Sequence, residues 1–484
     1  MNPIRFLLDG ERIEVEVIDP TRTLLQYLRE DLRRVGSKEG CAEGDCGACT
    51  VVIAEVVDDT LQYRALNACI QFLPTLDGKA LFTVESLKSA DGSLHPVQQS
   101  MVDHHGSQCG FCTPGFIMSM FALYQNNAVP SRAEIDDALS GNLCRCTGYR
   151  PIVDACIHMY DYPRSEIDQA GLLVALRELS RAPGLSLELE RASYHAPERI
   201  DELAALYQQH PAATILAGGT DVGLWVTKQL RELPQVIYLG NVIELRRIET
   251  GAHGIEIGAA VTLTDAFAAI VKVYAELGEM FRRFASVPVR NAGTLVGNVA
   301  NGSPIGDSMP ALIAIDTRVK LRLGHQRREM ALEDLYLDYM KNAMQPGEFI
   351  ESIVIPPRDA SLQLRCYKLS KRFDQDISAV CAAFALRLDG DRVADVCIAL
   401  GGMAAIPQRA RQTEAWLQGK AWDETTVAAA MNKLRIEFTP LSDMRASADY
   451  RSRCTVNLLY RFYLETRPGQ ALASSEVNVF AVHA

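Results

Sequence analysis

The chain has 484 residues, of which 48% are hydrophobic and 23% are charged. This length predicts about two to four domains, and the composition is typical of a globular protein. The formal net charge of −11 argues against a nucleic-acid-binding protein, because no basic field is available to meet phosphates. No stretch approaches about 18 uninterrupted apolar residues, and the N-terminus lacks a signal-peptide core. We therefore expect a cytoplasmic protein with reduced thiols and no membrane span.

Residues 1–90 have the pattern of a small sheet with one helix. Two runs of alternating apolar residues flank the pair Asp9-Gly10, which is typical of a hairpin turn. A short loop rich in cysteine and glycine follows the helical segment. We expect strands over 4–8, 13–17 and 50–57, and a helix over 24–32.

Eight of the 13 cysteines form two sets of four within the first 146 residues. The first set, Cys41-x4-Cys46-x2-Cys49 completed by Cys69, has the spacing of a plant-type [2Fe–2S] cluster. The loop also holds the glycines at 40, 44 and 47. Glycine permits positive φ and lets backbone N–H groups point at cluster sulfur. Zinc sites more often pair two C-x2-C motifs or add histidines, so the spacing favours a cluster.

The second set is Cys109-x2-Cys112 with Cys144-x-Cys146. The first pair alone would also fit a redox motif or half a zinc site, but a single residue between the other two is unusual for zinc. Helical periodicity predicts a small bundle over 91–165, with the cysteines at helix ends. Ser131 and Glu134 have the spacing of a capping box. The remaining cysteines are expected to be small buried residues: Cys156, Cys366, Cys381, Cys397 and Cys454.

Residues 1–165 resemble the iron–sulfur part of the molybdenum hydroxylases, the family of xanthine dehydrogenases and aldehyde oxidases. The resemblance rests on EGCAEGDCGACTV, QCGFCTPG and GNLCRCTGYRPI. It implies that the second cysteine set holds the cluster nearest to molybdenum. It also implies that Gln108 and Cys146 lie near the pterin of that cofactor. Without the resemblance, Gln108 is equally well explained as a surface polar residue.

The second half contains two glycine-rich segments. In the first, an apolar run over 215–217 ends in Gly218-Gly219, which predicts a strand end that a phosphate could approach. A structural turn explains this pair equally well, and the absence of GxGxxG disfavours a Rossmann fold. The second, 286–310, is dense in glycine, asparagine, serine and threonine. We expect it to be a loop that wraps around a ligand.

Both segments resemble the FAD-binding domain of the same family. LAGGTDVGL resembles its first pyrophosphate loop, and NAGTLVGN and SPIGD resemble its second. The resemblance implies that Phe284 lies against the flavin ring, although a core phenylalanine is the alternative. It also implies the following FAD-binding residues: Leu216, Ala217, Gly218, Gly219, Thr220, Asp221, Val222, Ala292, Gly293, Thr294, Gly297, Asn298, Ser303, Pro304 and Asp307.

A third segment, 368–378 (KLSKRFDQDIS), resembles a flavin-flanking segment of xanthine dehydrogenases. A cation there, such as Arg372, would stabilise a reduced flavin anion, and a solvated loop is the alternative. The fold predicted is a multidomain α+β chain. Its domains are a ferredoxin-like β-grasp domain (1–90), a helical [2Fe–2S] domain (91–165), a linker (166–190) read as one helix, a non-Rossmann α/β FAD domain (191–365) and a small α/β C-terminal domain (366–484).

The resemblance implies the iron–sulfur/FAD subunit of a split, bacterial-type xanthine dehydrogenase. Hydroxylation of hypoxanthine and xanthine would then occur at a molybdopterin cofactor on a large partner subunit, in an αβ or (αβ)2 assembly, and no catalytic residue for it would lie on this chain. Electrons would pass through two [2Fe–2S] clusters to FAD and then to NAD+. Two alternatives stay open: the same role with an aldehyde or N-heterocycle substrate, and a stand-alone NADH-dependent reductase.

Overall fold

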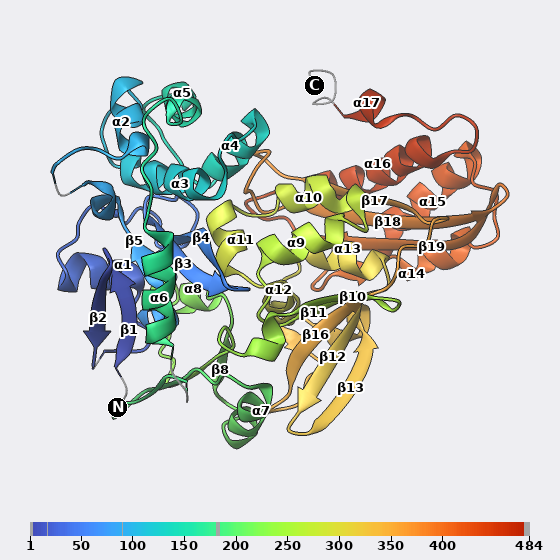
Figure 1. Cartoon of the computed structure of the whole chain (residues 1–484). Helices are drawn as coiled ribbons and strands as arrows, with labels where there is room; N and C mark the ends of the chain where they lie inside the picture. The colour runs from blue at the N-terminus through green and yellow to red at the C-terminus, as the bar shows by residue number, and fades with distance from the viewer. Residues whose placement is uncertain (1–2, 17, 90, 181–183, 479–484) are drawn as a thin grey trace. The chain divides into compact units, whose positions relative to one another are not determined.

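The computed structural model describes residues 3–16, 18–89, 91–180 and 184–478. The chain forms two compact units. Figure 1 colours the chain by residue number, from blue at the N-terminus to red at the C-terminus. Unit 1 comprises Met1–Arg246, Thr262–Thr264 and Ala285–Thr294. Unit 2 comprises Arg247–Val261, Asp265–Phe284 and Leu295–Ala484. In the described part of the chain, no helix combines the length and the apolar character that crossing a bilayer needs.

Unit 1 begins with a mixed sheet of strand order β2-β1-β5-β3-β4. Its strands are β1 (Ile4–Leu8), β2 (Glu11–Val15), β3 (Thr50–Val57), β4 (Thr60–Asn67) and β5 (Ala80–Phe82). Strands β1 and β5 are parallel and the other pairs are antiparallel. Asp9 and Gly10 both have positive φ, as a two-residue hairpin turn requires, so the predicted hairpin is confirmed. The predicted helix is α1 (Leu24–Gln26), which continues as a π-helical turn over Tyr27–Asp31.

Five helices follow: α2 (Pro96–Asp103), α3 (Thr113–Asn126), α4 (Arg132–Leu139), α5 (Arg150–His158) and α6 (Gln169–Leu179). Helix α3 packs against β3 and β4, and its buried face shares one hydrophobic core with this side of the sheet. Ser131 and Glu134 form the predicted capping box. The linker contains one helix, as predicted, but the helix is shorter than the segment: α6 begins after Asp168, whose carboxylate accepts the Gly171 N–H, and ends at Leu179. Residues 181–183 of that linker lie outside the described residues.

Unit 1 also contains a second sheet of order β6-β7-β9-β8, in which β7, β9 and β8 are parallel. Its strands are β6 (Ser186–Glu188), β7 (Ser193–His195), β8 (Thr214–Leu216) and β9 (Gln235–Tyr238), and this part of the chain also forms α7 (Ile200–Gln209) and α8 (Val222–Thr227). Helix α11 (Val287–Ala292) packs on β4 of the first sheet. Strand β8 ends one residue before Ala217-Gly218-Gly219, as the sequence predicts.

Unit 2 has two main sheets, of order β10-β11-β16-β12-β13 and β17-β18-β19-β20. The strands of the first are β10 (Ile248–Gly251), β11 (Gly254–Gly258), β12 (Arg318–Leu323), β13 (Gln326–Ala331) and β16 (Phe349–Ile355). Those of the second are β17 (Gln363–Leu369), β18 (Val380–Asp389), β19 (Arg392–Gly401) and β20 (Gln408–Arg409). A small hairpin joins β14 (Tyr336–Asp338) to β15 (Lys341–Asn342).

The helices of unit 2 cover these sheets and close the chain. They include α10 (Gly278–Arg282), α12 (Leu295–Asn301), α13 (Ser308–Ala314), α14 (Arg411–Leu417), α15 (Glu424–Glu437), α16 (Ala448–Thr466) and α17 (Ser474–Val477). Helix α13 packs on β18 and β19, and α16 packs on β17 and β18. Helix α9 (Leu263–Val271) begins in residues assigned to unit 1 and continues in unit 2.

The prediction that 286–310 is a loop is wrong. The segment forms α11, α12 and the first turn of α13, separated by short connections. Ser286 caps α11, and Pro288 stands in its first turn, where the missing N–H costs nothing. Leu295, Val296 and Val299 are buried at helical spacing. The small polar residues therefore lie on and between short helices.

Candidate functional site

The four thiols of the first cysteine set lie against one another. The Cys46 N–H donates to the Cys41 sulfur at 3.3 Å. Contact with Cys46 lowers the pKa of Cys41, and contact with Cys41 raises the pKa of Cys69. Thiols this close cannot all ionise unless positive charge lies among them. Iron supplies such charge in a thiolate-bound cluster, so the donor set fits the predicted group.

The glycines of this loop act in two different ways. Gly44 and Gly47 have φ of 79° and 71°, as predicted. The prediction is wrong for Gly40, whose φ is not positive. A Cβ at Gly40 would lie 2.8 Å from the Cys46 sulfur, so this position needs glycine for space. The loop thus keeps its ligands close by backbone turns at two positions and by the missing side chain at a third.

The four thiols of the second set also converge, but nearer to the surface. Cys109 interacts with Cys146, and Cys112 interacts with Cys144. Burial, followed by the neighbouring Cys144 thiol, raises the pKa of Cys112 to about 12. The side chains of Cys109 and Cys146 are exposed, as is that of Phe111 between the first pair. One edge of this site therefore faces away from the protein.

Local structure fixes the second set from both sides. Cys112 is the N-cap residue of α3, a helix of 14 residues. The Cys144 N–H donates to the Tyr149 hydroxyl at 3.0 Å, and its sulfur lies 3.2 Å from the Thr147 hydroxyl. Gln108, which the resemblance places near a pterin, is exposed beside Cys109. Its role stays a prediction.

A buried asparagine that the sequence analysis missed joins the two loops. Asn142 donates to the Gly47 carbonyl at 3.0 Å and to the Thr50 hydroxyl at 3.3 Å. Its own carbonyl accepts the Ser119 hydroxyl at 2.6 Å. The sequence shows only that Asn142 lies two residues before Cys144. Its partners in the first loop are more than 90 residues away in the sequence, so this contact could not be predicted. The two cysteine loops are therefore joined by a fully satisfied polar bridge.

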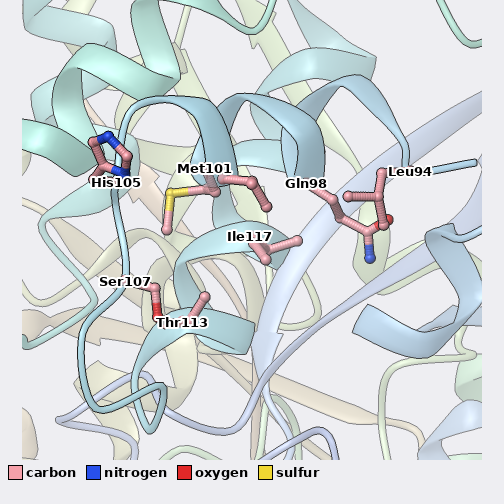
Figure 2. Close-up of a pocket in the computed structure, with 8 residues that line it drawn as sticks. Leu94, Gln98, Met101, His105, Ser107, Thr113 and Ile117 are labelled. Atoms are coloured by element: carbon pink, nitrogen blue, oxygen red, sulfur yellow. Dashed lines mark hydrogen bonds between the residues drawn. The ribbon is translucent and has the colours of Figure 1, made fainter.

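A hollow of about 340 Å3 lies beside the second loop, between α2 and α3. Figure 2 shows Met101 and Ile117 along its wall, with Ser107 and Thr113 at one end. Those two hydroxyl groups lie 2.7 Å apart and flank the Cys109–Cys112 segment. Across the described ranges, no group of three or more His, Cys, Asp or Glu side chains has the arrangement of a single-ion metal site. The contacts between the thiols, together with their spacing, carry the cluster assignment.

Unit 1 brings the first two predicted FAD segments together. A Cβ at Gly218 would lie 1.8 Å from the Ala292 carbonyl oxygen, so the two backbone segments are in contact at this point. Gly219 has φ of 74°, and the Gln71 amide donates to the Gly218 carbonyl at 3.0 Å. The Gly293 carbonyl accepts the Leu263 N–H at 2.7 Å. Only glycine at position 218 allows the two backbone segments to approach this closely. A close approach of backbone groups of this kind is what binding of a dinucleotide phosphate would need.

Unit 2 holds the remaining predicted FAD residues, one of which, Asp307, forms a buried ion pair. Lys368 donates from Nζ to Asp307 Oδ2 at 2.5 Å, and both side chains are at most 5% exposed. Lys368 also donates to the Ser378 hydroxyl at 3.0 Å. The other oxygen, Asp307 Oδ1, is buried without a hydrogen-bond partner among the described residues. A buried carboxylate oxygen in this state fits a hydroxyl donor from a bound ligand.

Lys368 was missed by sequence reasoning, which selected Arg372 from the same segment. Arg372 pairs with Asp376 at 2.6 Å and is half exposed, as expected for the solvated alternative. Phe284 packs edge-to-face on Phe267 with ring centroids 5.4 Å apart. The flavin-flanking roles of Arg372 and Phe284 therefore stay predictions. Lys368 lies in β17, which also carries Gln363 and Arg365, so its residue type alone did not set it apart.

Four family models match the chain in order. They are described as a 2Fe-2S iron-sulfur cluster binding domain (6–73), a [2Fe-2S] binding domain (83–157), a FAD binding domain in molybdopterin dehydrogenase (188–358) and a CO dehydrogenase flavoprotein C-terminal domain (365–466). The predicted fold class and the predicted set of two [2Fe–2S] clusters and FAD are confirmed by these domains.

Curated relatives include a xanthine dehydrogenase of Emericella nidulans, 32% identical over 98% of this chain and 39% of the relative. A xanthine dehydrogenase/oxidase of Gallus gallus is 30% identical over 95% of this chain and 40% of the relative. The chain thus spans about two fifths of the length of these relatives. A carbon monoxide dehydrogenase chain from Hydrogenophaga pseudoflava is 28% identical with a TM-score of 0.53, covering 57% of this chain and 96% of that one. Quinoline 2-oxidoreductase from Pseudomonas putida, 24% identical with a TM-score of 0.53 over 59% of this chain and all of its own, shares the fold.

Proposed function

This chain belongs to the molybdenum hydroxylases as an electron-transfer module with two [2Fe–2S] domains and a FAD domain, and we propose that it serves a xanthine dehydrogenase. A large partner subunit carries the molybdopterin cofactor and hydroxylates hypoxanthine and xanthine to urate. The two chains form an αβ pair or its dimer in the cytoplasm. NAD+ takes up the electron pair at the flavin.

The proposal assigns a separate task to each set of residues. When bound, the clusters supply one-electron redox chemistry and FAD supplies two-electron chemistry. Cys109, Cys112, Cys144 and Cys146 hold the entry cluster, and Cys41, Cys46, Cys49 and Cys69 hold the relay cluster. In unit 1, the contact of Gly218 with Ala292 would shape a phosphate loop. In unit 2, the Asp307 oxygen that has no hydrogen-bond partner among the described residues would accept a ligand hydroxyl.

The observation that carries the proposal is the convergence of both cysteine sets within one unit, where the second set has two exposed cysteines and the first has none. An exposed ligand pair suits electron entry from another protein, because the transfer distance stays short only if no peptide layer intervenes. The xanthine branch is supported by alignments in which the relatives match the cluster and flavin regions in one continuous chain. Aldehyde or N-heterocycle substrates would leave this chain unchanged, since the substrate pocket lies on the partner.

The test is an anaerobic visible spectrum of the purified chain before and after addition of NADH. The proposal predicts absorption from flavin and iron–sulfur centres that NADH bleaches. A flavin and iron–sulfur spectrum that NADH leaves unchanged would contradict NAD+ as acceptor. Co-purification of the tagged chain with a large molybdenum-containing polypeptide tests the partner. A chain that purifies alone and turns over NADH with a soluble acceptor would favour the stand-alone reductase.

A further inference from the structure

Asn67 is a polar residue whose amide side chain is buried without a hydrogen bond among the described residues. It ends strand β4 and is 1% exposed. Neither its Nδ2 nor its Oδ1 makes a hydrogen bond among the described residues. Leaving a buried amide unsatisfied is costly, and an isosteric leucine would avoid the cost. The position therefore points to a hydrogen bond that forms only when a further group is bound beside it.

The surroundings of Asn67 identify where that partner lies. Its amide is close enough to interact with the Cys49 thiol. Its Oδ1 would be 3.7 Å from a Cβ at Gly44, inside the first cysteine loop. Across the strand pair it stands opposite Thr50, the residue after Cys49. The unsatisfied amide is thus enclosed by the ligand segments of the first cysteine set.

Asn142 is a useful contrast, because it is the same residue type at the same depth. It is 2% exposed, and both of its amide atoms make hydrogen bonds to protein groups at 2.6 to 3.3 Å. The chain can therefore satisfy a buried asparagine near these loops by its own groups. At Asn67 it does not.

We propose that Asn67 is a positioning residue of the first cluster, donating its side-chain N–H to the Cys49 thiolate when that thiolate binds iron. This inference rests on the proposed assignment of the first cysteine set to a [2Fe–2S] cluster. A donor to a ligand sulfur stabilises the reduced, more negative state more than the oxidised state. Asn67 therefore raises the reduction potential of this cluster relative to the same loop without it.

The test is an EPR-monitored redox titration of the full chain and of two variants. Asn67→Leu keeps the volume and removes the donor, whereas Asn67→Asp keeps the shape and replaces N–H by oxygen. We expect both to lower the potential of the first cluster, with a tenfold change in the one-electron equilibrium corresponding to about 59 mV. The second cluster should keep its potential, and Cys112→Ser identifies which signal belongs to it. In D2O the iron–sulfur stretching bands of the first cluster should shift less in both variants than in the parent.

Asn142→Leu is the matched control. It should lower the thermal midpoint because it breaks three hydrogen bonds, while Asn67→Leu should leave the midpoint unchanged or raise it. Equal first-cluster potentials in the parent, Asn67→Leu and Asn67→Asp would overturn the inference. So would an Asn67→Leu variant that loses thermal stability as Asn142→Leu does but keeps the parent potential. A parent chain without any iron–sulfur signal would instead contradict the cluster assignment on which the inference rests.

Discussion

The two cysteine loops of unit 1 each bring together four cysteines, the proposed cluster ligands, but they differ in how far those cysteines are exposed. In the first, Cys49 and Cys69 are at most 3% exposed, and Gly44, Gly47 and the missing Cβ of Gly40 let the chain close around them. In the second, Cys109 and Cys146 are exposed. Two different cysteine spacings are thus proposed to hold the same kind of centre, and the packing around each loop decides which centre another protein can reach.

Removing one proposed ligand from each loop should have the largest effect, and the two variants should differ. Cys112→Ser should abolish electron transfer from molybdenum while FAD stays bound and NADH still bleaches it. Cys49→Ser should also disturb folding, because its side chain is in the core that surrounds the first loop. Iron content, FAD content and xanthine-to-NAD+ turnover of the two-subunit complex measure this. Full turnover in Cys112→Ser would contradict the order of the route.

The contrast between enclosed and exposed groups recurs in two ion pairs of unit 2. Lys368→Met leaves the Asp307 carboxylate buried without its cation and should cost about 3–5 kcal/mol of unfolding free energy. Arg372→Met removes the half-exposed pair with Asp376 and should cost about 0–1 kcal/mol. Urea unfolding of both variants measures the difference. Equal costs would mean that the Lys368 pair is hydrated.

A matched pair of glycines tests the two loops directly. Gly47 and Gly110 have φ of 71° and 84°, so alanine costs both a similar backbone strain of about 1–2 kcal/mol. At Gly47 the new Cβ would also lie 2.2 Å from the Gly141 carbonyl, whereas at Gly110 it would meet open space. We expect Gly47→Ala to lose an additional ~1–3 kcal/mol and part of its iron. If chemical unfolding gives both variants the same stability, the enclosed character of the first loop is wrong.

The smallest effect concerns the acid sensitivity of the helices that carry the second loop. Burial lowers the pKa of His95 to about 4, so the folded state keeps this side chain neutral. The unfolded chain binds a proton near pH 6.5, and stability therefore falls as the pH drops from 6.5 toward 4. His95→Asn keeps an N-cap acceptor for α2. Between pH 6.5 and 5, the unfolding free energy of this variant should fall by about 2 kcal/mol less than that of the parent. Thermal melts at pH 7, 6 and 5 check it, and parallel slopes for parent and variant would refute it.

Local patterns predicted much of this fold. The Asp9-Gly10 hairpin, the Ser131 capping box and the strand before Gly218 depend on residues close together in the chain, so their sequences specify them. The segment 286–310 was predicted wrongly because composition alone hid the helical spacing of its buried residues.

The candidate site could be predicted only where ligands follow a spacing rule. The cysteines met this condition. Lys368 did not, because its partner Asp307 lies 61 residues away and burial cannot be seen in a charged residue of the sequence. Asn67 and Asn142 are the same residue type, and only the packing shows that one is satisfied and the other is not.

The central claim is that the chain holds two clusters that differ in their exposure to solvent. EPR of the dithionite-reduced chain, with and without a soluble paramagnetic chelate, tests this claim most directly. The account predicts two [2Fe–2S] signals of equal spin count. The chelate should relax only one of them strongly, the one lost in Cys112→Ser, because Cys109 and Cys146 are exposed. A single signal, or two signals relaxed to the same extent, would contradict it.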